Sequence, residues 1–177
     1  MFKKLFTIVF LSLFVLIFYY TEITFAQATP QGTVSATVTA QNVSISVTSG
    51  TVAYGIMAAN THRSTIAADL NQTQTVTNTG NVDIDININS ADSTDWTLAA
   101  TTGADQYTHM FCHTSCGTPP TNFTALPAGP SYATFQEDVT SVTSNTRNLD
   151  LRLSTPTSTT EFGEQSMTVT LQASAAS

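Results

Sequence analysis

The sequence predicts an all-β fold, an antiparallel two-sheet sandwich or barrel, and three observations carry this prediction. Short segments alternate strictly between apolar and polar residues, as strands with one buried face do. Thr, Ser and Asn dominate the chain beyond residue 28, and these residues favour strands and turns. No segment of that region repeats its apolar residues with the period of a helix, and only residues 62–72 have the composition of a short helical turn.

Alternation defines two segments near the start of this region. Residues 34–40 place small apolar side chains at every second position, and residues 43–47 do the same with the opposite parity. A slip of one residue moves side chains to the other face of a strand, so we expect a bulge or bend at residues 41–42. In a sandwich, such a bend lets a first strand cross from one sheet to the other.

Further along the chain, alternation predicts strands in which apolar residues face a core and polar residues face water. The clearest of these segments are residues 82–89, 149–153 and 167–173. Less regular candidates are residues 51–56, 73–78, 96–99, 106–112, 122–126 and 132–139. The pattern places Asp83, Asp85 and Asp150 on faces that contact solvent. About ten short strands with one wet face are typical of an antiparallel sandwich or barrel.

The N-terminal 28 residues have the three parts of a signal peptide. Two lysines stand near its start, residues 5–20 are almost entirely apolar, and residues 26–28 (Ala-Gln-Ala) form a small-x-small cleavage pattern. We therefore expect export with cleavage after Ala28 or Ala26. The alternative is an uncleaved segment that anchors the protein to the membrane. Residues 29–177 remain after cleavage, and that length predicts a single domain.

The predicted mature chain is strongly acidic. Beyond residue 28 it contains three arginines, no lysine and eleven carboxylates, which give a formal net charge of −8. Such a surface repels phosphate backbones and anionic lipids, so composition excludes nucleic acid as a partner and excludes a polybasic membrane patch. We expect the partners to be the protein itself or other cell-surface components.

A turn sequence joins two of the predicted strands. Residues 78–81 read Asn-Thr-Gly-Asn, in which Gly80 can adopt a positive φ. This strand–turn–strand pattern resembles the Ig-like β-sandwich modules of bacterial secreted and surface proteins, closely over residues 73–98 and as a strand pattern over residues 33–174. The resemblance implies an Ig-like sandwich located outside the cell or on its surface, and it implies no activity.

Trp96-Thr97-Leu98 looks like the WxL signature of some cell-wall-binding domains, although the second copy of the motif is missing. The simpler interpretation is that Trp96 fills the core of the sandwich.

The side chains that could ligate a metal or react with a substrate gather in a loop-rich insertion at residues 99–135. His109, Cys112, His113 and Cys116 have a spacing that could hold zinc. In an exported chain, two cysteines so close in sequence favour a Cys112–Cys116 disulfide instead. A cysteine nucleophile paired with a histidine is the third interpretation, but no catalytic sequence motif accompanies it. We therefore expect no enzyme activity and no cofactor.

An acidic stretch offers a calcium alternative. Asp83, Asp85, Asn87 and Asn89 alternate along a predicted strand, with further carboxylates at residues 92 and 95. The glycine and the terminal glutamate of an EF-hand loop are missing, so a solvated strand face is the preferred interpretation. A surface site at residues 92 and 95 remains an alternative.

Two classes of function fit these observations. The first is a secreted or cell-surface structural or adhesion module, which assembles by strand addition through residues 31–40. The alternative is an extracellular module that binds a glycan or a protein through residues 99–135. Six aromatic residues are candidate contacts for that alternative: Trp96, Tyr107, Phe111, Phe123, Tyr132 and Phe135.

Overall fold

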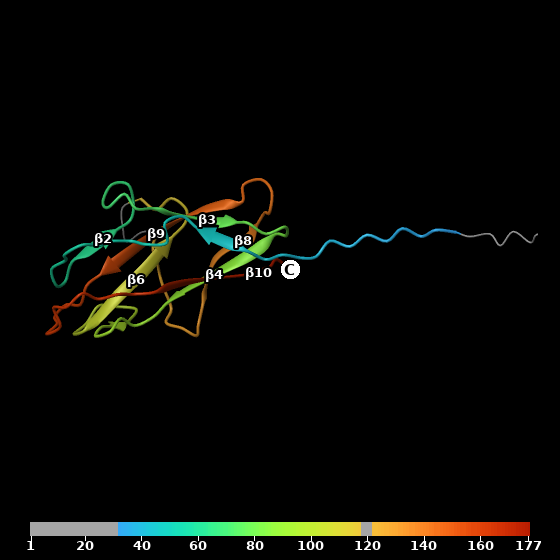
Figure 1. Ribbon diagram of the computed structural model, residues 1–177. Coiled ribbons are helices and arrows are strands. Elements are labelled where there is room, and N and C mark those ends of the chain that lie inside the picture. The colour runs from blue at the N-terminus through green and yellow to red at the C-terminus, as the bar shows by residue number, and fades with distance from the viewer. Residues whose placement is uncertain (1–31, 118–121) are drawn as a thin grey trace, which may run out of the picture. The chain divides into compact units, whose positions relative to one another are not determined.

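The computed structural model describes residues 32–117 and 122–177 (Figure 1). These residues contain ten strands and no helix, and so no helix within them could span a membrane. Thr39–Ser177 forms one compact unit, and residues 32–38 do not belong to it. The predicted signal peptide and its cleavage site lie outside the described residues.

The strands form two sheets, which confirms the predicted all-β, two-sheet fold (Figure 1). The larger sheet has the order β1 (Ile45–Val47), β3 (Gln74–Asn78), β9 (Thr146–Ser154), β6 (Gln106–Cys112) and β5 (Thr97–Leu98). In the same sheet, β2 (His62–Ser64) pairs with β9 and β7 (Thr124–Ala125) pairs with β6. The smaller sheet has the order β10 (Val169–Ala175), β4 (Ile84–Ser90) and β8 (Ala133–Val139). All strand pairs are antiparallel except the short β5–β6 pair.

Both sheets contribute to one main core, as the layers of a sandwich do. Ile84, Ile86 and Ile88 of β4 are fully buried, as the alternation of that strand predicts. They share the core with Phe111 of the larger sheet and Phe135 of the smaller sheet, whose ring centroids lie 6.2 Å apart. A smaller cluster is built on Leu98, Tyr107 and Leu153.

Two of the strands predicted in the first third of the chain are missing. Residues 34–40 form no strand, and their side chains are exposed instead of buried. Residues 51–56 form none either, because glutamine side chains replace a partner strand there. Gln72 accepts from the amide of Ala53 at 2.9 Å and donates to its carbonyl at 3.1 Å, and Gln74 accepts from the Gly50 amide.

The possible helical turn at residues 62–72 is a strand followed by a hydrogen-bonded turn. β2 occupies its start, and the Asp69 carboxylate then accepts from the Ser64 amide at 2.6 Å. The amide of Asp69 donates to the Ile66 carbonyl at 3.0 Å. A side chain that bonds to nearby backbone in this way competes with helix formation.

The Asn-Thr-Gly-Asn turn forms by a different mechanism from the one expected. Asn78 is buried and donates to the carbonyls of Val82 and Val139, both at 2.9 Å. Gly80 has no positive φ; a Cβ at this residue would lie 2.2 Å from the Asn42 carbonyl oxygen. The turn therefore requires glycine because another part of the backbone approaches it closely.

Trp96 lies at the margin of the fold and does not fill its main core. It is half-buried and packs against the smaller cluster, where its ring centroid lies 6.5 Å from that of Tyr107. Its indole N–H donates to the Thr159 hydroxyl at 3.2 Å. This side chain fixes the loops at one end of the sandwich.

Candidate functional site

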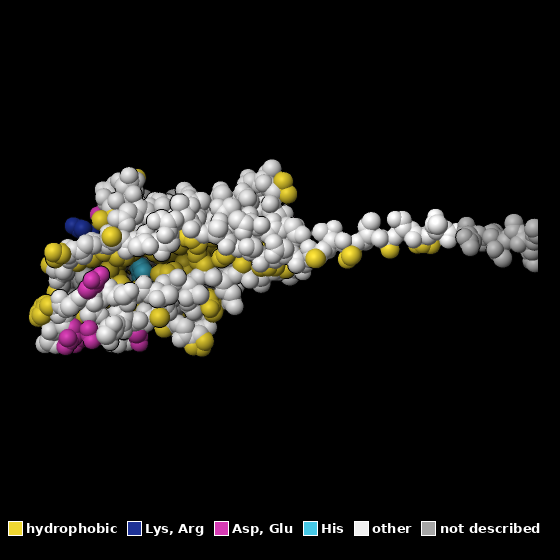
Figure 2. All heavy atoms as spheres, in the orientation of Figure 1, with side chains coloured by type: hydrophobic (Ala, Val, Ile, Leu, Met, Phe, Trp, Pro, Cys, Tyr) yellow, Lys and Arg dark blue, Asp and Glu magenta, His cyan; other side chains and the backbone are white. Residues whose placement is uncertain are grey.

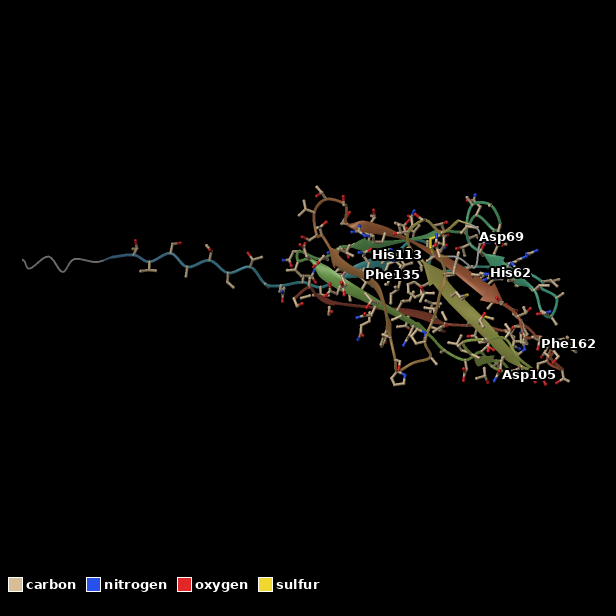
Figure 3. The ribbon with its side chains drawn as sticks, turned by 180° about the vertical axis from the view of Figure 1, so that it is seen from behind. His62, Asp69, Asp105, His113, Phe135 and Phe162 are labelled. Carbon is tan, nitrogen blue, oxygen red and sulfur yellow. A yellow bond between two sulfur atoms is a disulfide. The ribbon has the colours of Figure 1, made fainter. Side chains whose placement is uncertain are left out.

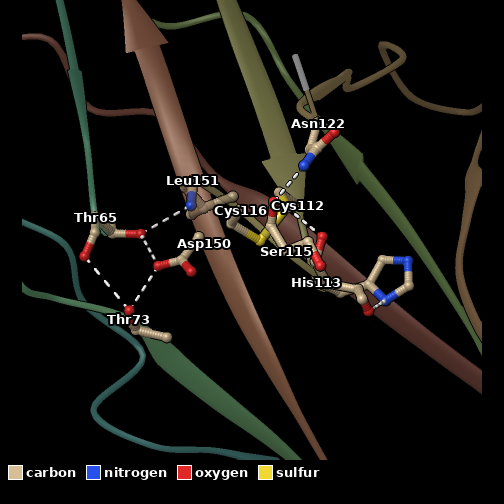
Figure 4. The surroundings of a disulfide bond; sticks show 10 residues. Thr65, Thr73, Cys112, His113, Ser115, Cys116, Asn122, Asp150 and Leu151 are labelled. Carbon is tan, nitrogen blue, oxygen red and sulfur yellow. Dashed lines mark hydrogen bonds between the residues drawn. A yellow bond between two sulfur atoms is a disulfide. The ribbon is translucent and has the colours of Figure 1, made fainter. Parts of the chain in front are cut away.

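The two cysteines form a disulfide, as the sequence predicts (Figure 4). Cys112 is the buried last residue of β6, and Cys116 follows in the adjoining loop. Their Cα atoms are 5.6 Å apart. The bond closes a ring of few residues, so its main effect is to order the loop that follows β6.

The disulfide decides between the three interpretations of the cysteine–histidine cluster. Both sulfurs are used in one covalent bond, so neither is a thiolate that could ligate zinc or attack a substrate. The four candidate ligands are not brought together as a metal site, since His109 and His113 contact different neighbours. The structure thus assembles the disulfide and neither of the two chemical alternatives.

His109 is the centre of a buried polar cluster. Its Nε2 lies 3.1 Å from the Tyr54 hydroxyl, and its Nδ1 lies 3.4 Å from the Ser90 hydroxyl. The ring centroid of Tyr107 is 6.4 Å away, and the hydroxyl of Tyr107 donates to the Ala91 carbonyl. Burial lowers the pKa of His109 to about 4, so the imidazole is neutral at physiological pH. It acts as a hydrogen-bonding part of the core.

His113 has different neighbours from His109. Its ring packs edge-on against Phe135 with centroids 5.5 Å apart (Figure 3), and its Nδ1 lies 3.0 Å from the Thr114 hydroxyl. Partial burial lowers the pKa of His113, and the positive charge of Arg147 lowers it further. Its environment resembles the margin of a core more than a catalytic centre. The third histidine, His62, is exposed on β2.

Asp150 is a buried residue whose role the sequence did not reveal (Figure 4). Alternation placed it on a solvent-facing side of β9, but the loop between β2 and β3 covers that side. One carboxylate oxygen accepts from the Thr65 hydroxyl at 3.0 Å and from the Thr73 hydroxyl at 2.6 Å. The Leu151 amide in turn donates to the Thr65 hydroxyl at 2.9 Å. This network attaches the loop to the sheet.

The acidic residues of the possible calcium site bond instead to protein amides. Asp83 accepts from the Ser141 amide and Asp85 from the Asp138 amide, both at 3.0 Å. Asp92 accepts from the Leu98 amide at 2.8 Å. Within residues 32–117 and 122–177, no three acidic, histidine or cysteine side chains come together as metal ligands. These carboxylates hold loops to strand ends.

The aromatic candidates for ligand binding are mostly internal. Tyr107, Phe111, Phe123 and Phe135 are buried, and Trp96 is half-buried. Tyr132 alone of the six counts as exposed, with 39% of its surface accessible, and Phe162, which lies outside the predicted region, is 87% accessible (Figure 3). Most of the candidate rings are therefore not available for contact with a ligand. Residues 99–135 also contain β6, which pairs with β9 and β5 inside the larger sheet.

One polar depression involves part of this region. Thr101, Thr102 and Thr108 line it together with Arg152, and its volume is about 330 Å³. The Arg152 Nε is buried and has no hydrogen-bond partner among the described residues. Nothing in the sequence pattern points to this residue, which alternation placed on a solvated face.

Two further features are the outer edge of β10 and the exposed segment at residues 32–40. β10 pairs with β4 on one side and with no described strand on the other. Its inward side chains, including Val169, Leu171 and Ala173, are only half-buried against the core. Residues 32–40 are exposed throughout, and Val34 and Val38 are each 95% accessible.

Comparisons of the chain with protein-family models, with curated proteins and with solved structures found no match.

Proposed function

We propose that this chain is an exported, non-enzymatic structural or adhesion module of the bacterial cell surface, with an Ig-like sandwich that assembles by strand addition. The observation that carries the proposal is the combination of a free sheet edge with an exposed, strand-patterned segment in the same chain. A row of unpaired backbone groups at a sheet edge is a template for another strand. Small exposed apolar residues at every second position supply the pattern that such a strand needs.

The buried polar groups support a structural role. His109, Asp150 and Asn78 each satisfy hydrogen bonds that hold loops or strands together. These are the polar residues from which an active site would be built, and here they connect parts of the fold. The apolar leader and the disulfide agree with export to an oxidising compartment.

The binding alternative has one observation in its favour, the polar depression beside residues 99–110. Its hydroxyl groups and the Arg152 guanidinium offer hydrogen bonds to a polar ligand such as a glycan. Glycan-array binding that is lost in Arg152→Gln, with the protein still folded, is the result that would favour this alternative.

The proposed function is tested by fractionating the producing cells and examining the secreted form. We expect the protein outside the cell or on its surface, in filaments or multimers visible by light scattering and electron microscopy. A protein found in the cytoplasm, or a secreted form that stays monomeric at high concentration, would contradict the proposal.

A further inference from the structure

We propose that residues 32–40 of one copy pair with the free edge of β10 in a second copy and place Val34 and Val38 in an apolar band beside that edge. This inference rests on the proposed function. It names the accepting surface, the donated segment and the direction in which the two strands run.

The free edge of β10 presents a regular row of backbone groups. Ala175 is opposite Ile84, and the Ala176 amide donates to the Asp83 carbonyl at 2.9 Å. In an antiparallel pair, hydrogen-bonded and non-hydrogen-bonded residue pairs alternate. The N–H and C=O groups of residues 169, 171, 173 and 175 therefore point away from β4. A further strand can satisfy all of them.

The side chains of the same four residues face the core, and that part of the core is incompletely covered. All four are half-buried, whereas the inward residues of the neighbouring β4 are fully buried. Figure 2 shows a hollowed band of hydrophobic side chains along this face of the compact unit. Ile45 of β1 packs partly buried against the same core, as do Val52 and Tyr54 of the segment that follows β1. A strand added to β10 would cover this band.

The other strand edges are less suited to accept a partner. β8 carries Glu137 and Asp138, the latter with a φ of 51°, and its pairing with β4 is irregular. Charges and bulges protect edges against further pairing. The edge strands β1 and β5 have only three and two residues. β10 has seven residues and contains no charge, proline or bulge.

Residues 32–40 have the pattern that this edge requires. Apolar side chains stand at residues 34, 36, 38 and 40, with the same spacing as the inward residues of β10. Thr and Ser occupy the alternate positions, and the segment has no charged residue. Valine and alanine are small enough to enter a shallow band. All nine residues are exposed, so their side chains are available to another copy.

The attachment point of the segment sets its direction. The Ala40 carbonyl accepts from the Asn81 side chain at 2.8 Å, at the turn that leads into β4. The C-terminal end of β10 lies at this same end of the sandwich, since Ala175 is opposite Ile84. In a head-to-tail row of copies, this end of one copy meets the opposite end of the next. The donated segment then enters at the N-terminal end of β10 and runs antiparallel to it.

A fold-back onto the chain's own β10 has a different geometry. Because Ala40 is held at the C-terminal end of β10, the segment would have to run parallel to that strand. The chain would also have to reverse at residues 41–42 before entering β1. The direction of pairing therefore distinguishes exchange between copies from closure within one copy.

A matched pair of variants of the secreted form tests the proposal. Val34→Asp/Val38→Asp puts two carboxylates in the apolar band, and Thr33→Asp/Thr37→Asp puts the same charges on the outward face. Both variants should fold normally, because all four side chains are exposed. We expect the concentration required for association to rise at least tenfold in the first variant and to change little in the second. Light scattering and electron microscopy give the measurement.

The outcomes separate this inference from the proposed function. A wild-type protein that stays monomeric contradicts both. A wild type that assembles while Val34→Asp/Val38→Asp assembles equally well overturns the inference and leaves the proposed function standing. Equal loss of association in both variants also overturns the inference. The added negative charge would then cause the loss, whichever face of the segment carries it.

Cysteine cross-linking tests the partner and the direction. With Val38 opposite Leu171, Thr37 is opposite Gln172, and both side chains point outward. We expect a mixture of the Thr37→Cys and Gln172→Cys proteins to form a disulfide between copies, under conditions that keep the native disulfide intact. Ala36→Cys points inward and serves as the matched control that should not cross-link. A monomeric Thr37→Cys/Gln172→Cys double variant that closes on itself would overturn the exchange between copies.

Discussion

The Tyr54 hydroxyl lies 3.1 Å from the Nε2 atom of His109, and this contact connects a segment without secondary structure to β6, an interior strand of the larger sheet. Gln72 holds the backbone beside Tyr54 through its side chain, so the segment is fixed from two directions. The segment around Tyr54, which borders the apolar band, is therefore held by side-chain hydrogen bonds and not by backbone pairing with a neighbouring strand.

The buried histidine predicts a loss of stability in mild acid. Burial lowers the pKa of His109 from 6.5 to about 4. Between these two pH values the imidazole is protonated in the unfolded chain and neutral in the folded protein. Stability is thus full above pH 6.5 and falls as the pH drops toward 4. Between pH 7 and pH 5 the free energy of unfolding should decrease by about 2 kcal/mol from this group alone.

Urea unfolding at several pH values measures this effect. His109→Gln should remove most of the decrease between pH 7 and pH 5, while His62→Gln, which changes an exposed histidine, should retain it. An unaltered pH profile in His109→Gln would mean that other groups cause the acid sensitivity.

The hydrogen bonds of Asp150 predict that removing this one carboxylate lowers the stability of the fold strongly. Asp150→Ala leaves the Thr65 and Thr73 hydroxyls without their acceptor in a buried place, which costs about 1–3 kcal/mol for each unsatisfied group. Asp150→Asn keeps an acceptor oxygen and should be milder. Glu137→Ala, which removes the same charge from an exposed position, should have little effect on the melting temperature. Equal melting temperatures for Asp150→Ala and Glu137→Ala would contradict the structural role of the network.

The close approach at Gly80 predicts that alanine is not tolerated there. The added Cβ would meet the Asn42 carbonyl oxygen at 2.2 Å, so the chain before β1 would have to move. Gly163→Ala is the matched control, because no atom lies within 4 Å of its Cβ position. We expect a clear drop in melting temperature for the first variant and almost none for the second. Hydrogen exchange should show the loss at residues 42–47, and a local effect elsewhere would contradict this explanation.

We expect the disulfide to contribute modestly to the stability of the protein and to act mainly on the loop after β6. Intact mass should increase by two hydrogen atoms on reduction, and Cys112→Ala/Cys116→Ala should lose about 1–2 kcal/mol of stability, because so short a ring restricts few unfolded conformations. Hydrogen exchange should increase mainly in the loop after β6. Two alkylatable thiols in the native protein would contradict the bond.

Sequence patterns located the strands well wherever a buried face alternates with a wet one. β4 and β6 begin and end within two residues of the predicted bounds, because their inward residues leave no other register. The same reasoning was wrong for residues 34–40, since alternation indicates the ability to pair and does not show that a partner exists in the same chain. It was also wrong for Asp150, because a loop from elsewhere covers the face that alternation left to water.

The candidate sites were less predictable for a related reason. The spacing of Cys112 and Cys116, together with the expectation of export, was enough to predict their disulfide. The contact between Tyr54 and His109 joins residues far apart in the sequence, in a segment that has no strand of its own. Nothing in the local sequence of either residue indicates the other.

The charge of the protein gives a final prediction about assembly. Residues 29–177 carry a formal net charge of −8, while residues 32–40 and β10 carry no charge at all. Repulsion between copies is therefore long-range and sensitive to salt, whereas the proposed strand pairing is apolar and backbone-mediated. Association of the secreted form should strengthen as sodium chloride rises from about 10 mM to about 500 mM, over which the screening length falls severalfold. Light scattering at fixed protein concentration measures this, and Val34→Asp/Val38→Asp should stay dissociated at both salt concentrations. Weaker association at high salt would indicate that ion pairs hold the copies together, and strand addition through an uncharged edge would then be the wrong explanation.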